Sequence, residues 1–155
     1  MSTDNKIQRL TPGASDESMN RVKWERFIPA GDFDAGDALI FDVEQTGSDK
    51  VLFVKQAPET GSGQNLFAGI ALESSAVTGS TEGRRSVRVA ISGYVPFAHV
   101  NAGAVAGETL QVGQGVAGQL SGSLNWPGAD GLVVAAALSD EVSGSAEVLL
   151  RPHFL

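Results

Sequence analysis

Apolar residues in this chain come in short runs that alternate with polar residues and end at turn-forming residues. Val87, Val89 and Ile91 alternate with polar or small neighbours, which is the period-two pattern of a strand with one buried face. About nine such segments recur without a long helical pattern between them, which predicts an all-β fold, a small β-sandwich or barrel. Besides Val87–Phe97 and the phrase at 67–72, they lie at 21–28, 38–44, 51–56, 109–112, 116–120, 132–138 and 146–151.

Four of these segments carry local signals. The stretch 21–28 contains neither Gly nor Pro, so a short helix is the alternative to a strand there. Gln45–Asp49 separates two strand-like runs and predicts a hairpin with a five-residue connection. Pro96 places the end of its strand at an edge or bend. The Ala-rich segment 132–138 could hold a helical turn instead of a strand.

The pattern also repeats along the chain. Two loop phrases are alike: Ala30-Gly31 leading to Gly36-Asp37 and Leu39, and Ala102-Gly103 leading to Gly107-Glu108 and Leu110. Two pairs of later segments are also alike: Phe67–Leu72 with Val133–Leu138, and Val87–Ser92 with Ala146–Leu150. Glycine adopts backbone conformations that other residues avoid, so these glycines mark tight connections. Two copies are too few for a solenoid, so we expect one β-rich domain, residues 22–155, with an internal pseudo-repeat.

The first 21 residues differ from this domain in polarity and charge. Their few apolar side chains and the turn-forming Thr11–Ala14 predict a flexible, extended N-terminal arm over residues 1–21. Residues 1–26 carry five bases and four acids, which leaves six bases and fourteen acids for the rest of the chain. No base lies between Arg88 and Arg151. An acidic body repels phosphate backbones, so nucleic acid is not an expected partner.

Composition narrows the function classes further. The 155 residues are 42% apolar, enough for one domain with a real core, and the net charge is -7. The absence of Cys removes disulfides, thiolate catalysis and Cys-ligated zinc. No apolar run is long enough to span a bilayer, and the first ten residues lack a secretory apolar core. We expect a soluble protein made in the cytoplasm, with no membrane partner.

Candidate chemistry is sparse. Gly113–Gly118 matches a dinucleotide fingerprint, but the Ser/Gly-rich residues that follow cannot form the required helix, so a hairpin turn is the simpler interpretation. Asp32, Asp34 and Asp37 could bind a hard cation, although acids that cap backbone amides in a turn explain them more simply. His99 and His153 have no triad or zinc pattern around them. We therefore expect no enzyme activity, no cofactor and no metal.

Basic and aromatic residues are the better candidates for partner contact. Arg84-Arg85-x-x-Arg88 is either a hairpin rim neutralised by neighbouring acids or a contact for an acidic protein surface. Trp126 lies in the loop Gly122–Gly128, where it either folds back on the sheet or binds a partner. Trp24 is the second candidate, because Trp is enriched in interface hot spots.

With both repeat phrases in view, the chain resembles the capsid decoration (cement) proteins of tailed bacteriophages, over most of residues 22–154. The resemblance implies a homotrimer that binds the major capsid protein on the outer surface of the head, between capsomers, and stabilises the head. It also implies that an extended N-terminal arm lies on the coat lattice and that the chain is a structural protein of the virion, made in the host cytoplasm. The partner-binding residues that we expect are Arg21, Lys23, Trp24, Phe27 and Trp126.

Two other classes remain open. Tyr94 and Trp126 could stack on sugar rings, as in a carbohydrate- or receptor-binding β module of a phage head fibre or tail. A lipoyl- or biotinyl-type carrier is also a small β-barrel with two pseudo-repeats. That class needs a modifiable Lys at a hairpin tip, and no Lys follows Lys55.

Overall fold

The structure, a computed structural model, describes residues 22–59, 66–77, 79, 82–112, 116–122 and 133–151. Within these ranges nine strands form one mixed sheet, which confirms the predicted all-β fold. The strands are β1 Lys23–Pro29, β2 Ala38–Phe41, β3 Phe53–Gln56, β4 Phe67–Ala71, β5 Val87–His99, β6 Thr109–Val112, β7 Leu120–Gly122, β8 Val133–Ala137 and β9 Ser145–Leu150. A short 3-10 helix, η2 Gly47–Val51, precedes β3. The predicted arm, residues 1–21, lies outside the described residues.

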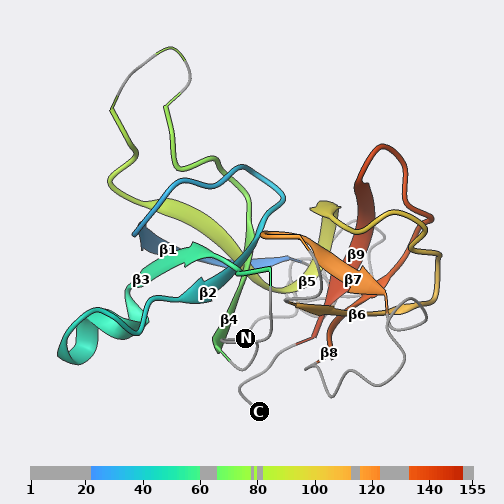
Figure 1. Ribbon diagram of the computed structural model, residues 1–155, viewed down its shortest axis with the longest axis horizontal. Helices are drawn as coiled ribbons and strands as arrows, with labels where there is room; N and C mark the ends of the chain where they lie inside the picture. The colour runs from blue at the N-terminus through green and yellow to red at the C-terminus, as the bar shows by residue number, and fades with distance from the viewer. Residues whose placement is uncertain are drawn as a thin grey trace, which may run out of the picture.

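The sheet curls into two lobes that share its longest strand, β5. Its strand order is β1-β3-β2-β4-β5-β9-β8-β6-β7, and β1 pairs with β5 as well as with β3. The first five strands therefore close into a ring, which we call the first barrel. In the second barrel, formed by β5 to β9, a parallel bridge between Val100 and Leu120 joins the residue after β5 to β7. The two barrels lie side by side in Figure 1, with β5 passing from one to the other.

Strand pairing repeats between the barrels residue by residue. β2 pairs with β3 and β4, and β6 pairs in the same way with β7 and β8. Both sets contain a register shift at the same place, after Leu39 in β2 and after Leu110 in β6. In β4 this shift is at Gly69, where the backbone of β5 approaches so closely that a Cβ would overlap the carbonyl of Ala90. The predicted internal repeat is thus a repeat of fold.

One detail of the predicted repeat is wrong by a residue. The amide of Ala30 binds the carbonyl of Val54 in β3, and the amide of Asn101 binds the equivalent carbonyl of Leu120 in β7, both at 2.8 Å. Ala30 therefore corresponds to Asn101, and the two Ala-Gly pairs are displaced by one position. Sequence similarity favoured the Ala-Gly match, whereas equal loop length between the strands sets the true alignment.

β5 serves both barrels because its two halves have different equivalents. Its first half corresponds to β9: the amide of Leu72 binds the carbonyl of Arg88, as that of Leu138 binds Glu147. Its second half corresponds to β1. Accordingly Trp24 lies opposite Ala90 and Tyr94 lies opposite Leu149, at matching register positions. Two outward pairs follow from this, Trp24 with Arg88 in the first barrel and Tyr94 with Glu147 in the second.

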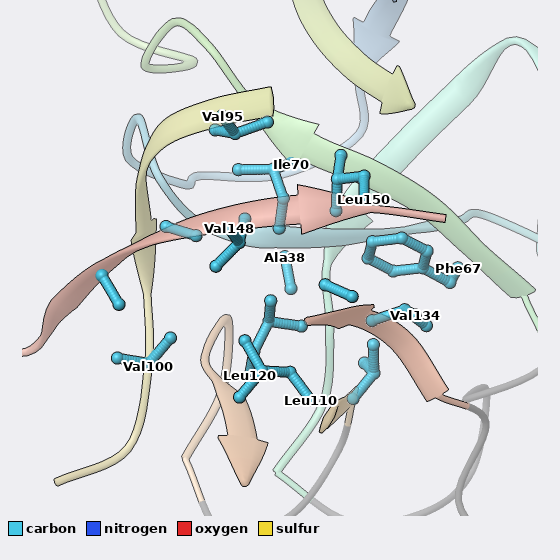
Figure 2. Packing of buried hydrophobic residues seen from close by; sticks show 14 of the residues in the cluster. Ala38, Phe67, Ile70, Val95, Val100, Leu110, Leu120, Val134, Val148 and Leu150 are labelled. Atoms are coloured by element: carbon cyan, nitrogen blue, oxygen red, sulfur yellow. The ribbon is translucent and has the colours of Figure 1, made fainter. Parts of the chain in front are cut away.

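Buried apolar residues fill each barrel and the contact between them. The interior of the first barrel contains Phe27, Phe33, Leu39, Val54, Ala68, Ala71, Val87 and Val89. Their equivalents in the second barrel are Ala98, Ala104, Leu110, Leu120, Val134, Ala137, Ala146 and Val148, all members of the larger cluster. That cluster also takes in Phe67 and Ile70 from the outside of the first barrel. In Figure 2 the Phe67 ring lies near Leu150 and Val134, and the Ile70 side chain lies near Leu150 and Val95. The barrels are therefore packed as one body.

Some of the predictions for individual segments are confirmed and others are wrong. Residues 21–28 were expected to form a strand and β1 does so from Lys23, while β8 is a strand and contains no helical turn. The hairpin of β2 and β3 is present, but its connection runs from Asp42 to Leu52 and includes η2. The predicted strand 116–120 is wrong in extent, because β7 begins at Leu120. Gly118 has a φ of 75° and turns the chain toward the first barrel.

Candidate interaction surface

The outer face of β1 is the clearest surface feature that the sequence singled out. Lys23, Trp24 and Arg26 are exposed, and 47% of the Trp24 surface is accessible. The Arg88 guanidinium lies over the Trp24 ring, 5.6 Å from its centroid, which is cation–π distance. Arg26 donates a hydrogen bond of 3.2 Å to the Ser86 hydroxyl. We call Trp24, Arg26 and Arg88 the basic aromatic face.

Like charges meet on this face, because the register sets Arg26 directly opposite Arg88. Glu73 offsets the repulsion: its carboxylate accepts a bond from the Arg88 amide and one from the Arg88 side-chain Nε, each of 2.9 Å. Burial raises the pKa of Glu73, but the two hydrogen bonds from Arg88 and the charges of Arg88 and Arg84 outweigh it, so the pKa lies below its ordinary value. Neutralisation of Arg88 by an acid agrees with the simpler interpretation of the Arg84–Arg88 cluster.

The fold places some of the predicted partner residues on the surface and one inside the first barrel. Lys23 and Trp24 lie on the surface, as a contact residue must. Phe27 has only 7% of its surface exposed and packs edge-on against Phe41, with the ring centroids 5.7 Å apart. Its alternation with Trp24 and Arg26 points it into the barrel, so we leave it out of the candidate surface. Arg21 and Trp126 lie outside the described residues.

The second barrel carries a matching face of opposite charge. Tyr94, 38% exposed, takes the place of Trp24, and exposed Glu147 takes the place of Arg88. Desolvation and the Glu147 carboxylate beside it raise the pKa of Tyr94. We call Tyr94 and Glu147 the acidic aromatic face. Sequence reasoning noted Tyr94 alone and missed this pairing, because the match depends on β5 being shared between the barrels.

A partly buried polar cluster around Asp37 joins the two barrels. The Asp37 carboxylate accepts bonds from the Asp34 amide at 2.9 Å and from the Gln56 side-chain amide at 2.8 Å. Its other oxygen lies 2.7 Å from Nδ1 of His99, which belongs to the half of β5 in the second barrel. The expected amide capping by acids in this turn is therefore present. Asp37 holds the loop before β2 and ties the barrels together.

Backbone hydrogen bonds also join the two barrels in this region. The His99 amide donates to the Gly36 carbonyl at 2.8 Å, and the Ala38 amide donates to the Gly118 carbonyl at 2.7 Å. The Gly118 amide in turn binds the Ala57 carbonyl at 2.9 Å. A Cβ on Gly118 would lie 2.8 Å from the Asp37 carboxylate, so only glycine fits. The turn at Gly118, which was expected to be part of a strand, thus holds the second barrel against the first.

Two hollows flank this region. One, of about 210 Å³, is lined by Phe33, Ala76, two serines and the carboxylates of Asp32, Asp34 and Asp37. The other, of about 280 Å³, has mostly apolar walls around Ile40, Phe41 and Leu66. Among the residues that the structure describes, no group of three or more His, Asp or Glu is arranged to hold a metal ion. Within the same residues, no helix is long and apolar enough to cross a membrane.

Neither comparison with known proteins assigns the chain to a group. No family model matches it, and no curated protein matches its sequence.

Proposed function

We propose that this chain is a capsid decoration protein of the kind found on tailed bacteriophages, which binds the outer surface of the head between capsomers and stabilises it. In this proposal its partners are the major capsid protein and two further copies of itself. Its place is the outside of the virion, after synthesis in the host cytoplasm. Its role is structural, without catalysis or a cofactor.

The position of β1 carries the proposal. This strand puts exposed Lys23 and Trp24 immediately after the 21-residue N-terminal segment, on a barrel that also carries Arg26 and the Arg84–Arg88 cluster. The second barrel has no Lys or Arg from Val89 to Leu150. A decoration protein needs one side that grips the lattice and one that faces outward, and this uneven distribution of Lys and Arg supports such a polarity.

The mechanism that fits is multivalent clamping. Fixing a flexible segment costs roughly 1–2 kcal/mol per residue, so a single arm of the predicted kind binds weakly. Three arms on one trimer bind at high effective concentration once the first is attached, which multiplies the affinity without new contacts. An arm in extended conformation can also add to an exposed sheet edge of the coat protein through main-chain bonds. The packed pair of barrels then acts as a rigid plug.

Cosedimentation with expanded heads assembled from the cognate coat protein tests the proposal. The full chain is expected to bind saturably, and a chain without residues 1–20 is expected to bind more weakly while its barrels stay folded. Lys23→Glu tests the base of the arm, with Lys50→Glu on η2 as the matched control. Unchanged occupancy after truncation would reject the arm model.

A failure of the full chain to bind any head would reject the function itself. If the isolated chain also bound defined glycans on an array, the carbohydrate-binding alternative would replace it.

A further inference from the structure

The two equivalent aromatic faces differ in charge, and this difference suggests what covers them. Trp24 and Tyr94 occupy the same register position in their barrels. The residue beside Trp24 is Arg88, and the residue in the same place beside Tyr94 is Glu147. Glu73 offsets the charge of Arg88, so Arg26 is the cation that distinguishes the first face, and Glu147 is the anion that distinguishes the second. One chain therefore presents two equivalent, partly apolar faces of opposite charge.

We infer that copies of this chain associate head to tail, with the basic aromatic face of one copy (Trp24, Arg26 and Arg88) seated on the acidic aromatic face of the next (Tyr94 and Glu147). This inference rests on the proposed function only for the number of copies. It names the surface through which the proposed trimer would form.

Charge decides between this arrangement and a symmetric one. If the same face met itself across a two-fold axis, the Arg26 and Arg88 side chains of both copies would share one interface, and like charges brought together there cost binding free energy. Contact between opposite faces instead brings Arg26 toward Glu147 of the neighbour. Lys and Arg are absent from the sequence between Arg88 and Arg151, whereas exposed Arg151 follows β9 on the same outward side as Glu147.

Aromatic residues supply the apolar part of the contact. Trp24 and Tyr94 are 47% and 38% exposed, and each has a charged residue near it on the adjacent strand. Aromatic rings of this kind bury a large area at small entropic cost and dominate many interfaces. Because a head-to-tail contact uses two different faces, an open chain of copies keeps one free face at each end, and the chain of contacts ends when a ring closes. Three copies in a ring fit the proposed trimer.

Sedimentation velocity on the isolated full chain, over a range of concentrations and without heads, tests this inference. Trp24→Ala is expected to weaken association by at least about thirtyfold, the effect of losing a hot-spot Trp. Arg26→Glu and Glu147→Arg are each expected to weaken it by at least about tenfold. A chain carrying both charge reversals is expected to associate again, because its two faces are once more complementary. Lys50→Glu, on exposed η2, is the matched control and is expected to change nothing.

Two results would overturn the inference: a chain that stays monomeric at every concentration, or association that survives both single reversals. Failure of the double reversal to restore association would equally contradict the pairing of these two faces. Head binding is measured separately, so a monomer that still decorates heads would end this inference and leave the proposed function standing. A chain that associates but binds no head would end the proposed function and leave this inference standing.

Discussion

Asp37 and Glu108 occupy the same position in the two barrels, and each carboxylate accepts a hydrogen bond from the backbone amide three residues before it. Their neighbours differ in a compensating way. The shorter Asp37 reaches Gln56 on β3, whereas the longer Glu108 lies against Gly122, which holds the equivalent place on β7. Asp with Gln and Glu with Gly thus fill the same space between two strands.

This compensation predicts coupling between Glu108 and Gly122. Gly122→Ala is expected to lower the free energy of unfolding by about 1–3 kcal/mol, because a Cβ there would overlap the Glu108 carboxylate. Gly122→Gln is expected to be worse alone than when combined with Glu108→Asp, which reproduces the first barrel. Urea unfolding of the unaltered chain, of the single variants Gly122→Gln and Glu108→Asp, and of the double variant measures the coupling. Additive effects of the two substitutions would show that these residues do not share one space.

Asp37 itself is expected to be among the most sensitive positions outside the apolar core. Asp37→Ala leaves the Asp34 amide, the Gln56 amide and His99 without their shared partner at the joint between the barrels. We expect a loss of about 2–4 kcal/mol in the free energy of unfolding. Asp32→Ala, on exposed Asp32 of the same loop, is the control and should change stability by less than about 0.5 kcal/mol. Equal effects from the two substitutions would contradict the assigned role.

Phe27 and Trp24, three residues apart on β1, are expected to behave in opposite ways. Phe27→Ala removes a ring from the interior of the first barrel and should cost about 3–5 kcal/mol of stability. Trp24→Ala removes an exposed ring and should cost less than about 1 kcal/mol in the unassociated chain. Thermal unfolding at low protein concentration separates them. A strongly destabilised Trp24→Ala monomer would mean that Trp24 is a core residue.

Stability is expected to fall as the solution is acidified, through Asp42 and Glu73. Hydrogen bonds from Gln45 and Lys55 lower the pKa of Asp42, and bonds and charge from Arg88 lower that of Glu73 against the opposing effect of burial. A carboxylate whose pKa is lower in the folded state stabilises the fold above its unfolded pKa, and that contribution disappears as pH falls through the folded value.

The matching measurement is the urea midpoint between neutral pH and pH of about 3. Glu73→Gln and Asp42→Asn should each make the decline with acidity shallower, since the titrating group is gone. Glu59→Gln, at an exposed position, is the control. A decline of unchanged slope in both variants would show that other groups cause it.

The sequence predicted the β class and the repeat because both depend on local signals. Period-two alternation at Val87–Ile91 and the glycines at Gly36 and Gly107 are visible without any structure. The shared role of β5 was not visible, because a strand of 13 residues that ends one barrel and begins the next looks like any long strand. The position of Phe27 inside the barrel followed from register, which only the pairing with β5 fixes.

The candidate surface was predicted in part for the same reason. Lys23 and Trp24 stood out by charge and residue type. Glu147 did not, since an isolated acid in the second repeat carries no signal until its place diagonally across from Tyr94 and its equivalence to Arg88 are known. The sequence shows the type of each residue, whereas the pairing of neighbouring strands determines which residues share a surface.

The central claim, that this chain decorates a viral head from outside, is tested most directly by electron cryomicroscopy of cognate expanded heads with and without the purified chain. The account predicts additional density on the outer surface at the three-fold and quasi-three-fold positions between capsomers, large enough for the paired barrels. Heads that look the same with and without the chain, or density confined to their inner surface, would contradict it.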